Sequence, residues 1–302
     1  MNRCSQVLAD KCTTTLAGFI RSSGAIKIDH LTFNGSLKYL MLCDPSISVV
    51  ITGASSFEIY ESSLGMIVPN GPAISQARLS DFLLGVTRVR KQYEDVLRLK
   101  ACGASAAWLL VSTYYCAYFA CVELGKIMNR IPMSLEDSDL YSLACKAVGT
   151  DHAAFFAAKH TNFVGSEHAG KLIFRSIGTK PHQAAWENAL YVLRQVLGGK
   201  GWTDANYYID LLENAELSPS RIRNTWNYRR PDYFGNSGER QASEFKKLVG
   251  NSPGATEWLK RTKGLVAPLD PCIVAVFCEA LASAISDAGH RAGELVRQAG
   301  DK

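Results

Sequence analysis

The sequence lacks the features of several classes of extracellular protein. It contains no CxxC pair, and its nine cysteines are an odd number. We therefore predict reduced, mostly buried thiols and no disulfide framework. No secretory signal is visible, because Asp10 and Lys11 interrupt the stretch where an apolar run would be needed. These absences favour a cytoplasmic protein.

Common metal and nucleotide motifs are also missing. There is no HExxH, GxSxG, kinase or dinucleotide-binding pattern. His152, His160 and His168 are spaced by eight residues, which turns each about 80° from the last around an ideal helix, so they do not converge on a metal. The run GGKG at 198–201 lacks the earlier glycine and the Ser or Thr of a phosphate loop. We predict neither a metal nor a cofactor.

Composition is that of a folded protein with a mildly basic surface. The 302 residues are 47% hydrophobic and 20% charged, with a net charge of +5, which permits a polyanionic partner without requiring one. Residues 101–122 carry no formal charge over about the length of a membrane span. Because this segment includes Gly103, several hydroxyl residues and three tyrosines, we interpret it as a buried core helix and predict no membrane partner.

The pattern of apolar residues changes near residue 72. Residues 26–33 alternate with period two, Asn34-Gly35 is typical of a hairpin turn, and 37–43 has the pattern of the return strand. Further strands are predicted at 48–52, 56–61 and 65–68. From 73 onward the spacing becomes helical, with helices predicted over 73–100, from after Gly103 to about 128, and over 135–148, 181–197, 205–214, 239–249, 255–263 and 271–298. The predicted fold is mainly α: a small β-rich N-terminal module (1–72) and a helical domain (73–302).

One stretch, SPSRIRNTWNYRRPD at 218–232, concentrates polar chemistry. Ser218 or Ser220 can cap a helix there, on which Arg223, Asn227 and Arg230 share one face. Guanidinium and amide groups suit a phosphate, because arginine donates in a planar fork and keeps its charge. The alternative is structural: an exposed basic helix end whose arginines pair with nearby carboxylates, namely Glu213, Glu216 and Asp232.

Two stretches resemble the HEPN superfamily. Residues 108–122, WLLVSTYYCAYFACV, ending at Leu124-Gly-Lys126, resemble the second core helix of HEPN domains. Residues 221–228, RIRNTWNY, resemble the HEPN motif in which an arginine is followed four to six residues later by histidine, and Arg223-Asn224 resembles its arginine-polar start. As a helical pattern the resemblance covers roughly residues 75–300.

The resemblance implies a four- or five-helix bundle, often dimeric, and a metal-independent endoribonuclease of a bacterial antiphage defence or toxin–antitoxin system. It implies RNA as substrate, a homodimer, and a possible partner protein from the same system. Arginine stabilises the charge that develops on phosphorus when the 2′-OH of RNA attacks. The expected catalytic residues are Arg223, Arg221, Asn227 and Tyr228, and the expected substrate-binding residues are Asn224, Arg229 and Arg230.

The sequence departs from this family at the histidine. Asn227 and Tyr228 occupy the corresponding positions, and neither is a good base at neutral pH. His168 and His182 are other candidates for the base. Three hypotheses remain: an RNA-cleaving effector, an inactive HEPN-like module that binds RNA, a nucleotide or a protein, and a structural helical subunit.

Overall fold

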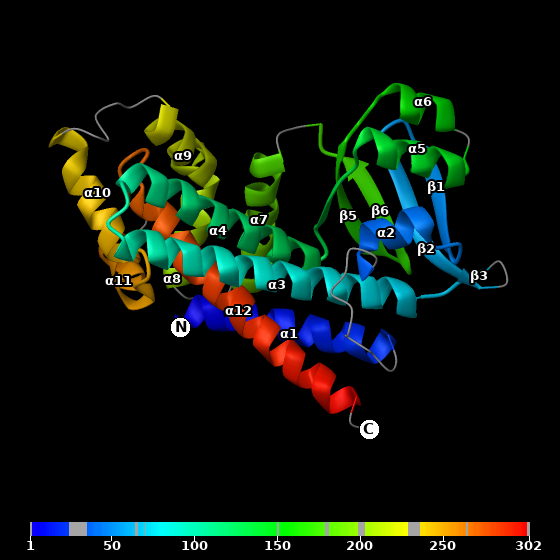
Figure 1. Ribbon diagram of the computed structural model, residues 1–302, viewed down its shortest axis with the longest axis horizontal. Helices are drawn as coiled ribbons and strands as arrows, with labels where there is room; N and C mark the ends of the chain where they lie inside the picture. Colours follow the sequence, from blue (N-terminus) through cyan, green and yellow to red (C-terminus); the bar gives the residue numbers. More distant parts are fainter. Residues whose placement is uncertain are drawn as a thin grey trace. The chain divides into compact units, whose positions relative to one another are not determined.

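The computed structural model describes residues 2–23, 35–63, 66–69, 71–149, 151–178, 181–198, 203–228, 236–263 and 265–300. They are mostly helical, with one small antiparallel sheet (Figure 1). The chain forms two compact units. The helical unit comprises Met1–Cys12, Gly85–Leu124 and Ala185–Gly289, and the sheet unit comprises Thr13–Leu84, Gly125–Ala184 and His290–Lys302.

The elements follow one another in mixed order. The helices are α1 (Arg3–Ser23), α2 (Leu37–Cys43), α3 (Pro72–Ala101), α4 (Ala106–Ile127), α5 (Asp137–Lys146), α6 (His152–Ala157), α7 (Pro181–Leu197), α8 (Thr203–Glu213), the 3-10 turn η2 (Ala215–Leu217), α9 (Pro219–Tyr228), α10 (Asn236–Leu248), α11 (Ser252–Thr262) and α12 (Cys272–Gly300). The strands are β1 (Ile47–Gly53), β2 (Ser56–Ser63), β3 (Met66–Ile67), β4 (Ile131–Ser134), β5 (Asn162–His168) and β6 (Lys171–Ser176).

In the helical unit, α3 and α4 lie antiparallel and side by side (Figure 1), as the sequence predicted. Gly103 makes the turn between them with φ +70°, a conformation that suits a residue without Cβ. The Cys116 thiol donates to the Val89 carbonyl across the pair (3.8 Å). The start of α12 is buried on every side, from Cys272 to Cys278, so it is the central helix of this unit.

Two helices are long and apolar enough to cross a membrane by length and composition. They are α4 and the 272–299 part of α12, and 61% and 83% of their most apolar windows are buried inside the protein. Helices of a protein core pass the same test, and for α4 the burial agrees with the sequence-based interpretation of a core helix.

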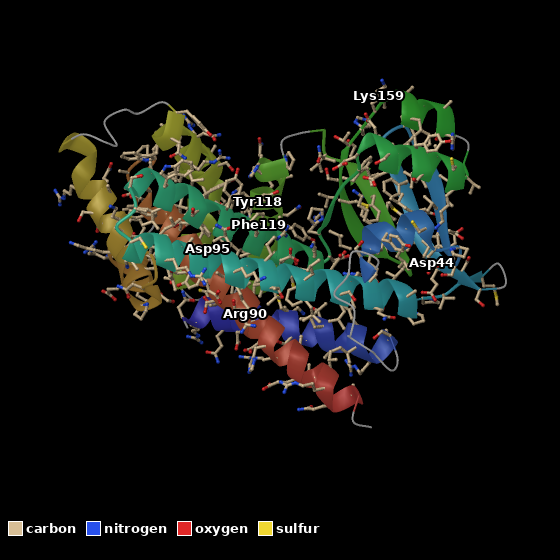
Figure 2. The ribbon with its side chains drawn as sticks, viewed as in Figure 1. Asp44, Arg90, Asp95, Tyr118, Phe119 and Lys159 are labelled. Atoms are coloured by element: carbon tan, nitrogen blue, oxygen red, sulfur yellow. The ribbon has the colours of Figure 1, made fainter. Side chains whose placement is uncertain are left out.

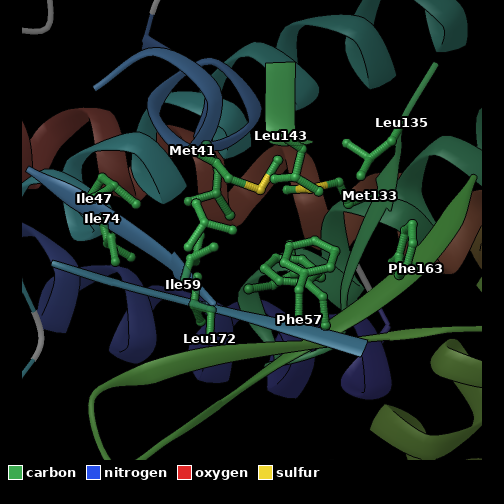
Figure 3. Packing of buried hydrophobic residues seen from close by; sticks show 14 of the residues in the cluster. Met41, Ile47, Phe57, Ile59, Ile74, Met133, Leu135, Leu143, Phe163 and Leu172 are labelled. Carbon is green, nitrogen blue, oxygen red and sulfur yellow. The ribbon is translucent and has the colours of Figure 1, made fainter. Parts of the chain in front are cut away.

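The sheet unit contains an antiparallel sheet with strand order β1-β2-β6-β5-β4, and β3 pairs with the end of β2. Alternate residues of β1, β2, β4, β5 and β6 point into one core, which α2, α5 and α6 help to close (Figure 3). Phe57 lies at its centre, stacked on Phe174 (4.9 Å between ring centroids) and edge-on to Phe163 (5.2 Å). Gly165 in β5 is required by this packing, because a Cβ there would lie 2.5 Å from the Phe174 ring.

The prediction of a strand at 37–43 is wrong, because Leu37–Cys43 forms helix α2. The Ser36 side chain caps this helix by accepting from the Tyr39 N–H, and Leu37 and Met41, four residues apart, are buried together. The helical spacing of these two buried residues, and not the alternation of apolar and polar residues along 37–43, therefore decides the local structure. The predicted strand at 26–33 and Asn34 lie outside the described residues.

The division predicted at residue 72 differs from the two compact units. Strands β4, β5 and β6, which the sequence analysis did not identify, come from residues 131–176 and complete the sheet begun by β1 and β2. The N-terminal residues 3–23, ahead of the predicted strands, form helix α1.

Candidate functional site

Helix α9 carries the arginine-rich stretch, and its amphipathic character fixes how it lies. Pro219 is its first residue, where the missing N–H costs nothing. Ile222 and Trp226, one turn apart, are fully buried. The Trp226 indole N–H donates to the Leu269 carbonyl (2.5 Å). Trp226 therefore anchors the helix and is not available to stack on a base.

Arg223 lies against the tyrosines of α4. The centre of its guanidinium is 4.9 Å from the Tyr114 ring centroid and 5.6 Å from that of Tyr115, within the range of cation–π attraction. Its Nε atom is buried and has no hydrogen-bond partner among the described residues. Within the same described part of the chain, no carboxylate pairs with Arg223 or with Arg221. The positive charge is thus held by aromatic rings, with no carboxylate paired to it in the described ranges.

Tyr114 supports this arrangement as a neutral phenol. It is fully buried, lies 3.1 Å from the Ser220 hydroxyl and accepts from the Trp186 indole N–H at 3.5 Å. Burial raises the pKa of Tyr114, although the hydrogen bonds from Ser220 and Trp186 and the charge of Arg223 oppose the shift. Tyr114 therefore stays protonated at neutral pH and does not act as a base.

Asn227 lies one turn beyond Arg223 on the same helix. Its side-chain nitrogen is also buried without a hydrogen-bond partner among the described residues. Buried donors left without an acceptor are costly and uncommon, at about 1–3 kcal/mol each. Two such donors thus lie one helical turn apart, on Arg223 and Asn227.

The other predicted site residues do not share the buried position of Arg223 and Asn227. Arg221 and Asn224 are exposed, and Tyr228 is 77% exposed at the end of α9. Arg229 and Arg230 lie outside the described residues. The structure therefore brings Arg223 and Asn227 together and leaves Arg221, Asn224 and Tyr228 toward solvent.

Where they are described, the carboxylates that the structural alternative requires form no ion pair with the arginines of α9. Glu213 binds Arg194 at 2.7 Å. Glu216 is exposed and forms no ion pair with an arginine of the described part of α9. Asp232 lies outside the described residues.

A second arginine of the same unit was not identified from the sequence. Arg88, on α3, lies 4.3 Å from the Phe119 ring centroid and binds the fully buried Glu123 at 2.7 Å. Gly85 makes room for that carboxylate, since a Cβ at Gly85 would lie within 2.3 Å of its oxygens. The signal in the sequence was Glu123 itself, the first charge after the long uncharged run of α4.

Aromatic rings connect the two arginines along α4. Tyr115 lies 6.0 Å from Phe119, and Tyr114 stacks on Tyr118 at 6.3 Å. Figure 2 labels Tyr118 and Phe119 on this helix. The cluster thus runs over about one helical turn from Arg223 to Arg88.

The helical unit contains no histidine that could supply the acid–base group of the resembled family. All six histidines of the sequence fall outside the ranges of the helical unit. His168 ends β5 and His182 lies in the first turn of α7, both in the sheet unit. Among the described residues, no group of three or more His, Cys, Asp or Glu side chains could hold a metal ion.

Comparison with protein-family models, with curated protein sequences and with solved structures finds no significant match to this chain. The chemistry of the site therefore has to be argued from its own residues.

Proposed function

We propose that this protein is a HEPN-like, RNA-directed effector whose helical unit binds a backbone phosphate of RNA. The observation that carries the proposal is the Arg223 guanidinium, held against two tyrosine rings without a carboxylate among the described residues. An uncompensated, partly buried cation with an unpartnered N–H attracts an anion that can accept from it. Asn227 adds a second donor one turn away.

RNA fits this site better than a free phosphate would. Tyr115, against the arginine, and Tyr118 and Phe119, farther along α4, are half-buried, and aromatic side chains stack on the unpaired bases of single-stranded RNA. Tyr228, exposed at the end of α9, supplies another ring. In this proposal the protein acts in the cytoplasm as a homodimer, in an antiphage defence or toxin–antitoxin system, alone or with a protein partner.

Binding is favoured over cleavage, because the helical unit contains no histidine and burial keeps Tyr114 protonated. The second candidate is a metal-independent endoribonuclease. Arg223 favours it, since a guanidinium without a carboxylate can stabilise extra charge on phosphorus. The base would then come from outside the helical unit, such as from a second subunit.

Fluorescence anisotropy with a labelled single-stranded RNA tests the proposal. Arg223→Ala should weaken binding about 10- to 100-fold, the value of a hydrogen bond to a charged group. Arg223→Lys should recover only part of the affinity, because an ammonium lacks the planar fork. Arg98→Ala is the matched control: it removes the same charge from a side chain that is 72% exposed on α3, and should leave the affinity unchanged.

The proposal fails if the folded wild-type protein binds no RNA at low salt, or if Arg223→Ala and Arg98→Ala weaken binding equally. The same RNA, incubated with the protein and a metal chelator, separates the two candidates. Cleavage that persists with the chelator and disappears in Arg223→Ala supports the endoribonuclease. Binding without cleavage supports the recognition module.

A further inference from the structure

A polar cavity of the sheet unit has no role in the proposed function. Its volume is about 170 Å³, similar to an engineered cavity of about 150 Å³ that holds a benzene molecule. A wider hollow of about 430 Å³ adjoins it, and the two share Thr15, Phe19, Arg78 and Glu167. Helix α1, the start of α3 and the β5–β6 hairpin supply the lining residues.

Arg78 is the main polar group of the cavity wall. Its side chain is only 5% exposed and forms an ion pair with Glu167 at 2.5 Å. One face of its guanidinium lies 4.2 Å from the Phe19 ring centroid, and Nη2 donates to the Lys126 carbonyl at 3.5 Å. The Nε atom is buried and finds no acceptor among the described residues. Arg78 lines both hollows and keeps one N–H without an acceptor in the part of the chain that the structure describes.

The position of Glu167 is fixed by its backbone. The Asn129 side chain accepts from the Glu167 N–H (2.5 Å) and donates to its carbonyl (3.3 Å). The carboxylate uses one oxygen for Arg78 and remains 30% exposed. The cavity wall therefore holds a guanidinium next to a partly exposed carboxylate that uses one oxygen for it, both kept in place by the protein.

Charge complementarity selects the ligand class. A simple anion would be attracted by Arg78 and repelled by Glu167. A simple cation would be attracted by Glu167 and repelled by Arg78. A small molecule that carries both charges on neighbouring atoms satisfies each partner at once. We propose that this cavity binds a small zwitterion of the α-amino-acid class, its carboxylate toward Arg78 and its ammonium toward Glu167. The smaller chamber accepts a molecule of about the size of glycine, alanine or serine.

Isothermal titration calorimetry with glycine, L-alanine and L-serine on the full chain tests this proposal, with acetate and methylammonium as single-charge comparators. At least one amino acid should bind, and at least tenfold more tightly than either comparator. Glu167→Gln should weaken amino-acid binding about tenfold and strengthen acetate binding, because the pair then carries a net positive charge. Glu58→Gln is the matched control. It breaks an ion pair with Lys171 in the same sheet, outside the cavity, and should change the affinity for neither the amino acid nor acetate.

A second variant tests the cavity without touching the ion pair. A Cβ at Gly18 would meet no atom within 4 Å, and Gly18 lines the smaller chamber. Gly18→Leu should fill the space, abolish amino-acid binding and leave the melting temperature equal or higher. The proposal is overturned if the folded wild type binds none of the three amino acids, if acetate binds as tightly, or if Glu167→Gln and Glu58→Gln behave alike.

Discussion

Each unit contains an arginine whose guanidinium lies against aromatic rings. The two arginines differ in whether a carboxylate pairs with them. Arg223 in the helical unit lies against Tyr114 and Tyr115 without an acidic partner among the described residues. Arg78 in the sheet unit lies over Phe19 and is neutralised by Glu167. Aromatic rings position the guanidinium in both cases. We propose that the carboxylate decides which ligand binds: an anion at Arg223, and a molecule with both charges at Arg78.

The largest expected effect concerns the platform that holds Arg223. Trp226→Ala should lower the free energy of unfolding by about 4 kcal/mol, because it removes a large buried ring together with its hydrogen bond to Leu269. RNA affinity should fall with it, since α9 loses its anchor. Tyr228→Ala, two residues on and exposed, is the control and should leave urea unfolding unchanged. A Trp226→Ala protein as stable as Tyr228→Ala would contradict the anchoring role.

The next effect compares the two arginines directly. Arg78→Ala should cost about 3 kcal/mol of stability, because it leaves the Glu167 carboxylate without its cation. Arg223→Ala should lower the free energy of unfolding by about 1 kcal/mol or less, the value of a cation–π contact, because no carboxylate among the described residues loses its cation. Chemical denaturation of the two variants measures both numbers. Equal losses would show that the carboxylate is not the distinction between the sites.

The smallest effect is the pH dependence of two carboxylates. Burial raises the pKa of Glu279 in the helical unit, against hydrogen bonds from Tyr93 and Gly250 and the charge of Lys100. Its contribution to stability is therefore greatest at low pH and declines as pH rises from its ordinary value of 4.5 through the raised one. Glu279→Gln should remove this decline, as unfolding measured between pH 4 and 8 would reveal. A decline that persists in Glu279→Gln would assign it to another group.

Asp44 in the sheet unit (labelled in Figure 2) should show the opposite sign. A hydrogen bond from the Ser46 side chain lowers its pKa, so its contribution is present above its ordinary value of 3.8 and is lost as pH falls through the lowered one. Asp44→Asn should abolish this acid-side loss. The effect should be small, because the group is mostly solvated. An unchanged acid-side slope in Asp44→Asn would contradict the assignment.

The sequence predicted the helices of the chain better than its sheet. Spacings of three and four residues identified α3, α4, α7 and α12 nearly to their ends, because each helix presents a continuous apolar face to a core. Strands β5 and β6 were missed. Gly165 interrupts the apolar alternation of β5, and the hairpin turn at Ala169 and Gly170, both with positive φ, carries no Asn-Gly or Asp-Gly signal.

The candidate site was predictable only in part. Helical spacing placed Arg223 and Asn227 on one face, and each has a buried donor that finds no acceptor within the described ranges. It could not show that Tyr114 and Tyr115, more than a hundred residues earlier, would hold the guanidinium. Arg78 and Glu167 lie 89 residues apart in the sequence. Local sequence patterns do not predict this ion pair, because the tertiary fold brings the two residues together.

The Nε–H resonance of Arg223, followed by proton–nitrogen NMR during titration with single-stranded RNA, tests the central claim most directly. Loss of the signal in Arg223→Lys assigns it. The account predicts that this resonance shifts strongly downfield and saturates with the same affinity as anisotropy reports, since the buried donor gains a phosphate oxygen. RNA that binds tightly while the Arg223 resonance stays in place would contradict it.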